Sequence, residues 1–382
     1  MLKILTIVGA RPQIIKAAAL SRAIRNHFSE QIREIIIHTG QHYDENMSAV
    51  FFSELGIPLP DYNLQVGSGS HGKQTAAMII ALEEILLKEK PHALVIYGDT
   101  NSTLAGAIAA SKLHVPVVHI EAGLRSFNKA MPEEVNRIMA DHISTLLFSP
   151  TSTGYKNLVK EGFKENNPGP YNADNPHIIH CGDVMYDNSL YFSEIADSKT
   201  NILKDENLTD GEFILATIHR NNNTDEPERL SALFSALNRI SLKEGIKIIL
   251  PLHPRTAKLL EKNLSKELLA AVKANSAFQI LEPVSFLEMI TLEKHARLVM
   301  TDSGGVQKEA FYFHKPCIIL RPETEWVELV QSGAAIIADA DENRILEAYH
   351  SFAISKTLKF PPLFGDGHAS EYICSELLKT FA

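Results

Sequence analysis

Short apolar runs alternate with helical patterns along almost the whole chain of 382 residues, and this alternation constrains the fold more than any other feature. Continuous apolar runs of this length are typical of strands buried on both faces of a parallel sheet. We interpret twelve runs as strands: 2–8, 33–39, 92–98, 115–120, 145–149, 177–181, 212–218, 246–252, 278–282, 296–301, 316–320 and 334–338. Strands that alternate with helices predict an α/β fold, here two doubly wound, Rossmann-like domains.

The helical patterns of the first half fill the spaces between its strands. They fall at 11–27, 44–55, 71–89, 100–113, 133–143 and 151–161. The segment 182–210 is predicted to connect the domains, which gives a first domain over 1–190 and a second over 191–365. A last helix within 366–382 is expected to pack back on the first domain. The Pro/Gly-rich segment 164–176 is predicted to be a surface loop.

Composition and charge exclude several classes of function. A hydrophobic content of 45% with 22% charged residues is typical of a globular protein, and no apolar stretch approaches the roughly 18 residues of a membrane helix. The first eight residues are better explained as a buried strand than as a signal peptide, so the cytoplasm is the expected compartment. The net charge of −9 argues against nucleic acid or an anionic membrane as a partner.

The sequence indicates neither a metal nor a cofactor. His38 and His42 are four residues apart, but Gly40 between them argues against a helical metal site. Residues 67–72 match GxGxxG, yet no strong strand precedes them, and none of the ten tyrosines has a lysine four residues on. We therefore reject an NAD site. The three cysteines are widely spaced and are expected to be free thiols: Cys181, Cys317 and Cys374.

Polar motifs follow seven of the predicted strands. They are Gly9-Ala10-Arg11-Pro12, His38-Thr39-Gly40-Gln41-His42, Gly98-Asp99-Thr100-Asn101, His119-Ile120-Glu121-Ala122-Gly123, His219-Arg220, His253-Pro254-Arg255 and Ser303-Gly304-Gly305. Ligands bind outside the carboxyl ends of the strands in open parallel sheets. Because the motifs come from both halves, they predict one cleft between two facing domains.

The segment from Thr301 to Ala310 predicts a nucleotide site. Gly304 and Gly305 let backbone N–H groups approach a ligand closely, and N–H groups at a helix start favour phosphate. Glu309 lies about one turn further on, placed to accept a hydrogen bond from a sugar hydroxyl. Taken alone, the segment is equally consistent with an ordinary strand–turn–helix.

Basic residues at the strand ends are candidates for phosphate binding. Arg11 and Lys16 flank the start of the first helix, where the alternative is a solvated basic turn. The pair His219-Arg220 has the same position in the second domain. His253 and Arg255 repeat the pattern after the next strand, and a buried structural histidine is the alternative for His253.

Two acidic residues at strand ends are candidates for catalysis. Asp99 is either the N-cap of the helix that follows it or a catalytic carboxylate. Glu121 ends an apolar run, a position that is costly unless the carboxylate is paired or used. Arg125, four residues further on, is its candidate partner.

Pro132-Glu133-Glu134 has the composition of a helix start, with acidic residues that complement the helix dipole. Adjacent helical residues point about 100° apart, so at most one of the two glutamates faces a cleft. Arg137 is placed to orient Glu133.

Together these segments resemble the non-hydrolysing UDP-N-acetylglucosamine 2-epimerase family over essentially the whole chain. The residues that carry the resemblance are 98–103, 119–125, 132–137, 219–220 and 301–310. The resemblance implies a GT-B fold, a UDP-sugar substrate, no cofactor and a homodimer. It also implies that C2 of the sugar is inverted by elimination of UDP to a 2-acetamidoglucal and re-addition, for surface polysaccharide precursors.

The resemblance further implies roles for single residues. Asp99, Glu121 and Glu133 would be the carboxylates at the sugar, with Glu121 as the preferred C2 base, and His219 would be a general acid or phosphate-side donor. The diphosphate would be bound by Arg11, Ser303, Gly304 and Gly305, and the ribose by Glu309. The remaining substrate-binding candidates are Lys16, Gln41, His42, Arg137, Arg220, His253 and Arg255.

The chain departs from the usual family pattern. Gln13 stands where Glu is usual, and residues 41–44 and 73–74 differ in regions that hold a second, activating UDP-sugar in many bacterial members, so the resemblance does not carry that regulation over. Residues 126–128, 253–256 and 324–328 resemble a branch that includes epimerases acting on UDP-2,3-diacetamido-2,3-dideoxyglucuronate, where Arg255 is a candidate for the uronate carboxylate.

Three other functions are consistent with this sequence: a GT-B glycosyltransferase, a hydrolysing 2-epimerase and a non-catalytic nucleotide-sugar sensor. Three candidate acids near one sugar favour elimination chemistry over a glycosyltransferase, and the intact set of carboxylates argues against a sensor.

Overall fold

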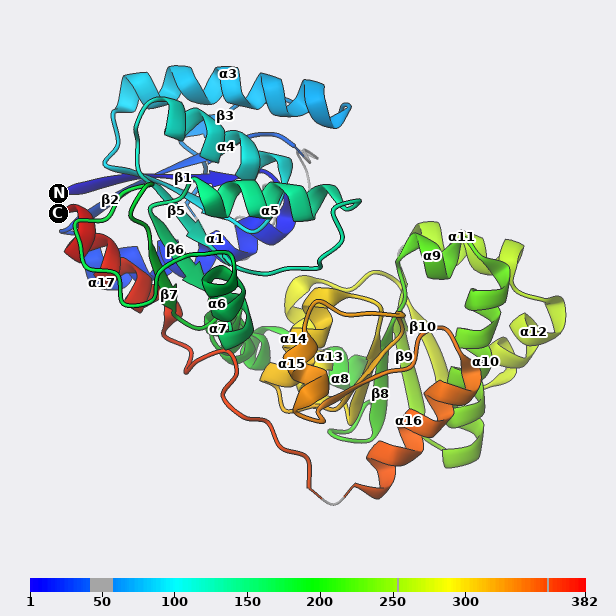
Figure 1. The fold of residues 1–382 in the computed structure, drawn as a ribbon. Helices are drawn as coiled ribbons and strands as arrows, with labels where there is room; N and C mark the ends of the chain where they lie inside the picture. The colour runs from blue at the N-terminus through cyan, green and yellow to red at the C-terminus, as the bar shows by residue number, and fades with distance from the viewer. Residues whose placement is uncertain (42–57, 253, 356) are drawn as a thin grey trace. The chain divides into compact units, whose positions relative to one another are not determined.

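The computed structural model describes residues 1–41, 58–252, 254–355 and 357–382, and for residues 254–255 it describes the backbone alone (Figure 1). The chain forms two compact units, which are Met1–Asn188 with Pro362–Ala382 (unit 1) and Ser189–Pro361 (unit 2). The predicted helix 44–55 lies outside the described residues. Each unit has its own parallel sheet, so the predicted α/β fold class is confirmed.

Unit 1 contains a seven-stranded sheet in the order β3-β2-β1-β4-β5-β6-β7, with every pair parallel. Its strands are β1 (Leu2–Val8), β2 (Ile32–His38), β3 (Tyr62–Asn63), β4 (Ala93–Tyr97), β5 (Val117–Ile120), β6 (Leu146–Ser149) and β7 (His177–His180). All but β3 were predicted, and β3 is too short to give a sequence pattern. The order reverses between β1 and β4, and ligands of doubly wound sheets bind at such a reversal.

Helices cover both faces of this sheet. They are α1 (Arg11–Ala23), the π-helical turn η1 (Ile24–Phe28), α3 (His71–Glu89), α4 (Asn101–Lys112), α5 (Pro132–His142), α6 (Ser152–Lys160) and α17 (Ala369–Phe381), while α7 (Val184–Lys199) begins in unit 1 and continues into unit 2. Helices α3, α4 and α5 lie on one face, and α1 and α17 on the other (Figure 1). Asp187 of α7 anchors α17 by accepting hydrogen bonds from the backbone N–H groups of Ala369 and Ser370, at 3.1 and 2.7 Å.

Close packing of α4 on the sheet fixes the position of the chain after β4. Every residue of β4 is buried, and the face of α4 toward the sheet carries small residues such as Ala105 and Ala109. A Cβ atom on Gly106 would lie 3.2 Å from Ile96 Cγ2, so this glycine permits the close approach. The link between β4 and α4 is therefore held at the point where the strand order reverses.

Unit 2 contains a six-stranded parallel sheet in the order β10-β9-β8-β11-β12-β13. Its strands are β8 (Phe213–Thr217), β9 (Lys247–Pro251), β10 (Phe278–Leu281), β11 (Leu298–Thr301), β12 (Cys317–Ile319) and β13 (Ala335–Ile337). All six were predicted. The order reverses between β8 and β11, whose last residues, Thr217 and Thr301, are paired in register and lie 2.5 Å apart through their hydroxyl groups.

The helices of unit 2 again lie on both faces of the sheet (Figure 1). They are α8 (Ile202–Asp205), α9 (Asn221–Thr224), α10 (Pro227–Glu244), α11 (Pro254–Asn263), α12 (Lys266–Ala274), α13 (Phe286–His295), α14 (Gly304–Tyr312), α15 (Val327–Gln331) and α16 (Glu342–Ile354). The largest part of the core lies between the sheet and helices α10 and α16. Over the described ranges, the helices are too short or too polar to cross a membrane.

Candidate functional site

Asp99 lies at the strand reversal of unit 1, directly after β4. Thr100, not Asp99, caps helix α4, since its hydroxyl accepts a hydrogen bond from the N–H group of Thr103 at 3.3 Å. Asn136 of α5 donates to the Asp99 carbonyl at 2.9 Å and so fixes the backbone. The structure thus decides against the N-cap alternative and leaves the Asp99 carboxylate for another use.

The Asp99 carboxylate lies in a crowded and charged environment. Its Oδ2 atom is 2.5 Å from Nη2 of Arg137, and its side chain is 32% exposed. Burial raises the pKa of Asp99, the cations Arg137 and Lys16 lower it by less, and the nearby Glu121 raises it further. A carboxyl group with a raised pKa is suited to hold and deliver a proton.

Glu121 forms a close ion pair at the end of β5. Its Oε1 atom is 2.5 Å from Lys16 Nζ, and each side chain is almost buried. Its φ angle is +74°, a conformation that is strained for a residue with a side chain and that persists only where the surrounding structure supports it. Arg125, the partner that we expected, pairs with other carboxylates instead, so that prediction is wrong.

Gly98 packs directly against this ion pair. A Cβ atom at Gly98 would lie 3.1 Å from Lys16 Nζ and 3.2 Å from Glu121 Oε1, and its φ angle is +59°. The Lys16–Glu121 pair and Asp99 therefore both adjoin Gly98, which follows β4 at the strand reversal.

Glu133 and Glu134 differ in environment at the start of α5. Glu134 is buried and accepts hydrogen bonds from the backbone N–H groups of residues 126–127, both at 2.9 Å. Glu133 is exposed, and its charge raises the pKa of Asp99. Arg137 contacts Glu134 at 3.4 Å as well as Asp99, so it does not orient Glu133 as expected.

The other predicted binding residues of unit 1 follow β1 and β2. Arg11 is the first residue of α1 and is exposed. Gln41 is buried, and its Oε1 atom accepts hydrogen bonds from the N–H and hydroxyl groups of Ser102 at 3.1 and 2.7 Å. The side-chain oxygen of Gln41 thus stabilises the start of α4. His42 lies outside the described residues.

In unit 2, the buried carboxylate of Asp302 organises the turn after β8. It accepts hydrogen bonds from His219 Nδ1 at 2.8 Å, from the backbone N–H groups of His219 and Arg220 at 3.1 Å each, and from Asn223 Nδ2 at 3.0 Å. Burial alone would raise the pKa of Asp302, but these hydrogen bonds outweigh burial and lower it.

The Asp302 contact selects one tautomer of the His219 ring. Because Asp302 accepts the proton of Nδ1, Nε2 is left as the ring nitrogen for a ligand, and the side chain is 52% exposed. Arg220 donates from Nε to the Asp302 carbonyl at 3.1 Å. A histidine held in this way can give or take a proton at Nε2.

Helix α14 begins just after Asp302, beside the His219–Asp302 pair. Ser303 is its N-cap, and Gly304 lies so close to a neighbouring loop that a Cβ atom there would be 2.1 Å from Oε1 of Glu325. Arg321 contacts the other oxygen of Glu325 at 3.0 Å. A carboxylate thus already lies against the helix start at which the sequence predicts an anion.

Glu309 lies on the first turns of α14 and is half-buried. Its Oε2 atom is 4.0 Å from the position of a Cβ atom on the exposed Gly305, so the carboxylate reaches back toward the helix start. Behind it, Glu293 of α13 is buried. Burial raises the pKa of Glu293 well above its usual value, and the neighbouring Glu309 raises it further.

Two predicted binding groups remain outside the described part of the chain, namely His253 and the side chain of Arg255. Across the described residues, no three histidine, cysteine, aspartate or glutamate side chains form a group that could hold a metal ion. The cysteines are free thiols, as predicted: Cys181, Cys317 and Cys374.

The sequence analysis missed two functional features of the site. Asp302 was part of a recognised motif, but its contact with His219 was not predicted, although an acidic residue directly after a buried strand was a usable signal. The Lys16–Glu121 pair joins residues 105 positions apart, and no local pattern indicates it.

Comparisons with known proteins agree with these observations. The family model described as UDP-N-acetylglucosamine 2-epimerase matches residues 24–378. The chain is 48% identical to the UDP-2,3-diacetamido-2,3-dideoxy-D-glucuronate 2-epimerase of Pseudomonas aeruginosa over 380 residues, which cover 99% of this chain and 100% of the relative. It is 48% identical to a UDP-N-acetylglucosamine 2-epimerase homolog of Methanococcus maripaludis, over 98% of this chain and 99% of the relative.

A solved structure is similar over the whole length. The crystal structure of the UDP-GlcNAc 2-epimerase of Methanocaldococcus jannaschii, in complex with UDP-GlcNAc and UDP, matches 99% of this chain and 100% of its own with a TM-score of 0.83 and 42% identity.

Proposed function

Because the chain belongs to the UDP-N-acetylglucosamine 2-epimerase family, we propose that it is a non-hydrolysing epimerase that inverts C2 of a UDP-linked 2-acetamido sugar, with UDP-N-acetylglucosamine as the first candidate substrate. One observation carries the proposal: polar residues of the segments that resemble the family lie at the strand reversals of both sheets. Carboxylates gather there in unit 1, and a histidine dyad and a helix start gather there in unit 2.

The chemistry explains why these residue types are needed. The C2 hydrogen is not adjacent to a carbonyl, so a carboxylate of ordinary basicity cannot simply remove it. When the C1–O bond to UDP breaks with help from the ring oxygen, positive charge develops at C1 and the C2 hydrogen becomes acidic. Loss of that proton gives a 2-acetamidoglucal and free UDP. Re-addition of UDP, with a proton delivered to the opposite face of C2, gives the epimer.

We assign the sugar-side steps to unit 1. Glu121 takes the C2 proton, and Lys16 next to it favours the ionised carboxylate that a base requires. Asp99, whose pKa is raised by burial, delivers a proton to the other face. Arg137 holds Asp99 in place, and the exposed Glu133 is a further carboxylate for the sugar.

We assign the departing UDP to unit 2 and Arg11. The start of α14, with Ser303, Gly304 and Gly305, stabilises the diphosphate through N–H groups, and Arg11 adds a positive charge. His219 donates a proton or hydrogen bond to the phosphate side through Nε2 while Asp302 holds Nδ1. Glu309 accepts from the ribose hydroxyls. The expected cleft between the domains, in which these groups would meet, stays a prediction.

The decisive experiment follows hydrogen exchange at C2. The protein is incubated with UDP-N-acetylglucosamine in deuterated water without any acceptor, and the products are examined by NMR. The proposal predicts deuterium at C2 in a mixture of the two epimers. A glycosyltransferase would leave C2 unlabelled, a hydrolysing epimerase would release free sugar and UDP, and a sensor would bind without turnover.

The second candidate substrate is UDP-2,3-diacetamido-2,3-dideoxyglucuronate. It is favoured by the 48% identity to the Pseudomonas aeruginosa enzyme. Arg255 is our candidate for binding the uronate carboxylate. The exchange assay run on both substrates decides between them, and Arg255→Ala should lower kcat/KM for the uronate alone.

We further propose that the enzyme acts as a cytoplasmic homodimer, as the family resemblance implies. Light scattering of the purified protein tests the oligomeric state, and a particle with the mass of one chain would contradict it.

A further inference from the structure

His119, on β5, forms two short hydrogen bonds although it is completely buried. Nδ1 lies 2.7 Å from Oδ1 of Asp141, and Nε2 lies 2.7 Å from the carbonyl oxygen of Gly98. A carbonyl oxygen can only accept. Burial raises the pKa of Asp141, but the contacts with His119 and Arg125 lower it by more. The His119 ring therefore links the Asp141 carboxylate to the Gly98 carbonyl, and Nε2 is the donor to the carbonyl oxygen.

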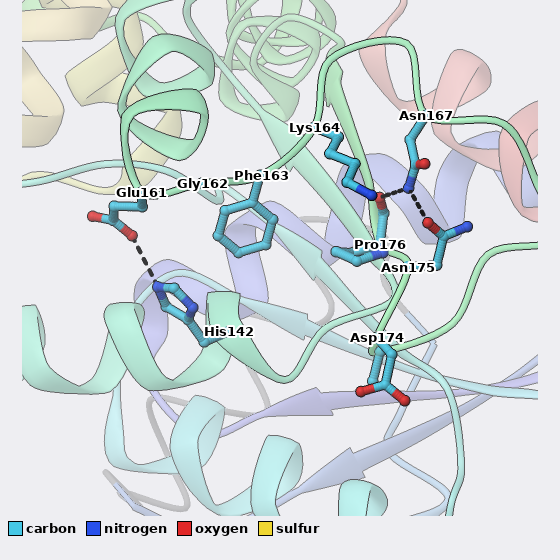
Figure 2. A pocket seen from close by; sticks show the side chains of 10 residues that line it. His142, Glu161, Gly162, Phe163, Lys164, Asn167, Asp174, Asn175 and Pro176 are labelled. Carbon is cyan, nitrogen blue, oxygen red and sulfur yellow. Dashed lines mark hydrogen bonds and ion pairs between the residues drawn. The ribbon is translucent and has the colours of Figure 1, made fainter.

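Further ion pairs connect His119 and Asp141 to the surface. Arg125 Nη1 lies 2.7 Å from Oδ2 of Asp141, and the rest of its guanidinium donates to both oxygens of Glu161 at 2.6 and 2.7 Å. Glu161 and His142, 3.1 Å apart, lie in the wall of an open pocket (Figure 2). The proposed reaction steps use none of these side chains.

His119 and Asp141, the buried end of this network, hold the backbone beside both proposed catalytic carboxylates, Asp99 and Glu121. The Gly98 carbonyl belongs to the peptide that leads into Asp99. Asp141 also accepts a hydrogen bond from Gly123 N–H at 3.1 Å, which closes the turn that contains Glu121. Because the φ angle of Glu121 is +74°, this turn needs support from outside.

We propose that His119 and Asp141 are positioning residues of the epimerase, which hold the Gly98–Asp99 peptide and the Glu121 turn at the separation that proton transfer on C2 requires. The inference rests on the proposed function, since it assigns these residues to that reaction. Their contacts to Gly98 and Gly123 are to backbone groups, so they act through the backbone.

Two amide variants of His119 separate positioning from general stabilisation. In His119→Asn, the amide nitrogen of the asparagine takes the position of Nδ1 of the histidine ring. This variant therefore keeps the contact to Asp141 and loses the contact to the Gly98 carbonyl. In His119→Gln, the amide nitrogen of the glutamine takes the position of Nε2. This variant therefore keeps the contact to the Gly98 carbonyl. Both variants remove the buried ring, and both are expected to lower the unfolding temperature.

The expected results differ between the variants. In His119→Asn, kcat for C2 exchange should fall on the order of 100-fold, because a displacement near 1 Å at a catalytic group has that effect. His119→Gln should retain most of the wild-type kcat. UDP affinity, measured by calorimetry, should be unchanged in both, because neither unit 2 nor Arg11 is altered. Equal kcat losses in the two variants, or a loss of thermal stability alone, would overturn the proposal.

Asp141→Asn provides an independent test, including the case in which His119→Asn does not fold, because its side chain keeps the shape of the original. It should lower kcat and leave UDP affinity unchanged, and a wild-type kcat would overturn the proposal. In the Asp141→Asn/His119→Asn double variant the two losses should be less than additive, since both residues act on one backbone segment. Absence of C2 exchange in the wild-type enzyme would instead refute the proposed function.

Discussion

The contact between Asp302 and His219 gives the sharpest prediction, through the variant Asp302→Asn. Four donor groups converge on the two carboxylate oxygens: His219 Nδ1, the N–H groups of His219 and Arg220, and the Asn223 amide. An asparagine keeps one oxygen and turns the other position into a donor. The consequence depends on which oxygen is replaced.

If the NH2 group takes the place of Oδ2, it faces the N–H group of Arg220 and the amide of Asn223, so one part-buried and one buried donor lose this acceptor. Each such loss costs about 1–3 kcal/mol, so this orientation costs about 2–6 kcal/mol. If it takes the place of Oδ1, it faces His219 Nδ1, which becomes an acceptor once the proton moves to Nε2. The second orientation is favoured, and it forces His219 into the other tautomer.

His219 then carries its proton at Nε2 and can still donate a hydrogen bond there, but the Asp302 anion that accepts from Nδ1 in the wild type is gone, so proton transfer at Nε2 loses that support. In the Ser-His-Asp triad of serine proteases the same exchange costs about 10⁴ in kcat. Loss of general acid–base catalysis costs about 10²–10⁴ more generally. We therefore expect kcat for C2 exchange to fall within this range, while UDP affinity changes by only a few-fold.

The assay is deuterium incorporation at C2, with UDP binding measured by calorimetry. The matched control is Asp210→Asn, which removes another histidine–aspartate contact of unit 2, 3.1 Å between His295 and Asp210, and should leave kcat unchanged. An Asp302→Asn enzyme with a kcat within a few-fold of wild type would refute the role assigned to the dyad.

Three further predictions concern carboxylates and a glycine. Glu121→Gln should lower C2 exchange by about 10²–10⁴ with UDP affinity retained, and near-normal exchange would exclude Glu121 as the base. Gly98→Ala should destabilise the protein more than Gly67→Ala. Both substitutions add a side chain at positive φ, but only the one at Gly98 meets the Lys16–Glu121 pair. Equal unfolding temperatures of the two variants would contradict this prediction. The pKa of Glu293 is raised above 4.5 in the folded protein, so its contribution to stability is complete below about pH 4.5 and is lost as the pH rises through the folded value. The unfolding temperature of Glu293→Gln should therefore fall less between about pH 5 and pH 8 than that of the wild type, and parallel curves would contradict the raised pKa.

The strands and their polar ends could be predicted from the sequence because parallel, doubly buried strands leave a local signal. Every residue of β4 and of β8 is buried, and each reads as an unbroken apolar run. The polar residue after such a run, Asp99 or His219, is then at a strand end by necessity. The two-residue β3 leaves no comparable signal.

The partners of the site residues could not be predicted, because they come from elements distant in sequence. Sequence spacing suggested Arg125 for Glu121, but the ammonium group of Lys16 reaches Glu121 from α1. Arg137 does lie one helical turn after Glu133 on α5, as the spacing suggested, but its guanidinium pairs with Asp99, which follows β4. Position along a helix limits which side chains can meet, and the fold decides which of them do.

The way the chain enters and leaves unit 2 sets the order in which the units can be completed. Helix α17, with its buried residues Ile373, Cys374 and Leu377, packs on α1 and η1, which are synthesised hundreds of residues earlier. While the ribosome makes unit 2, this apolar face of unit 1 is still uncovered, although its sheet is already present. Unit 2 is continuous in sequence and is complete first. A chain that ends at Pro361 would therefore lack α17 and leave this apolar face of unit 1 uncovered, although every strand of unit 1 would still be present.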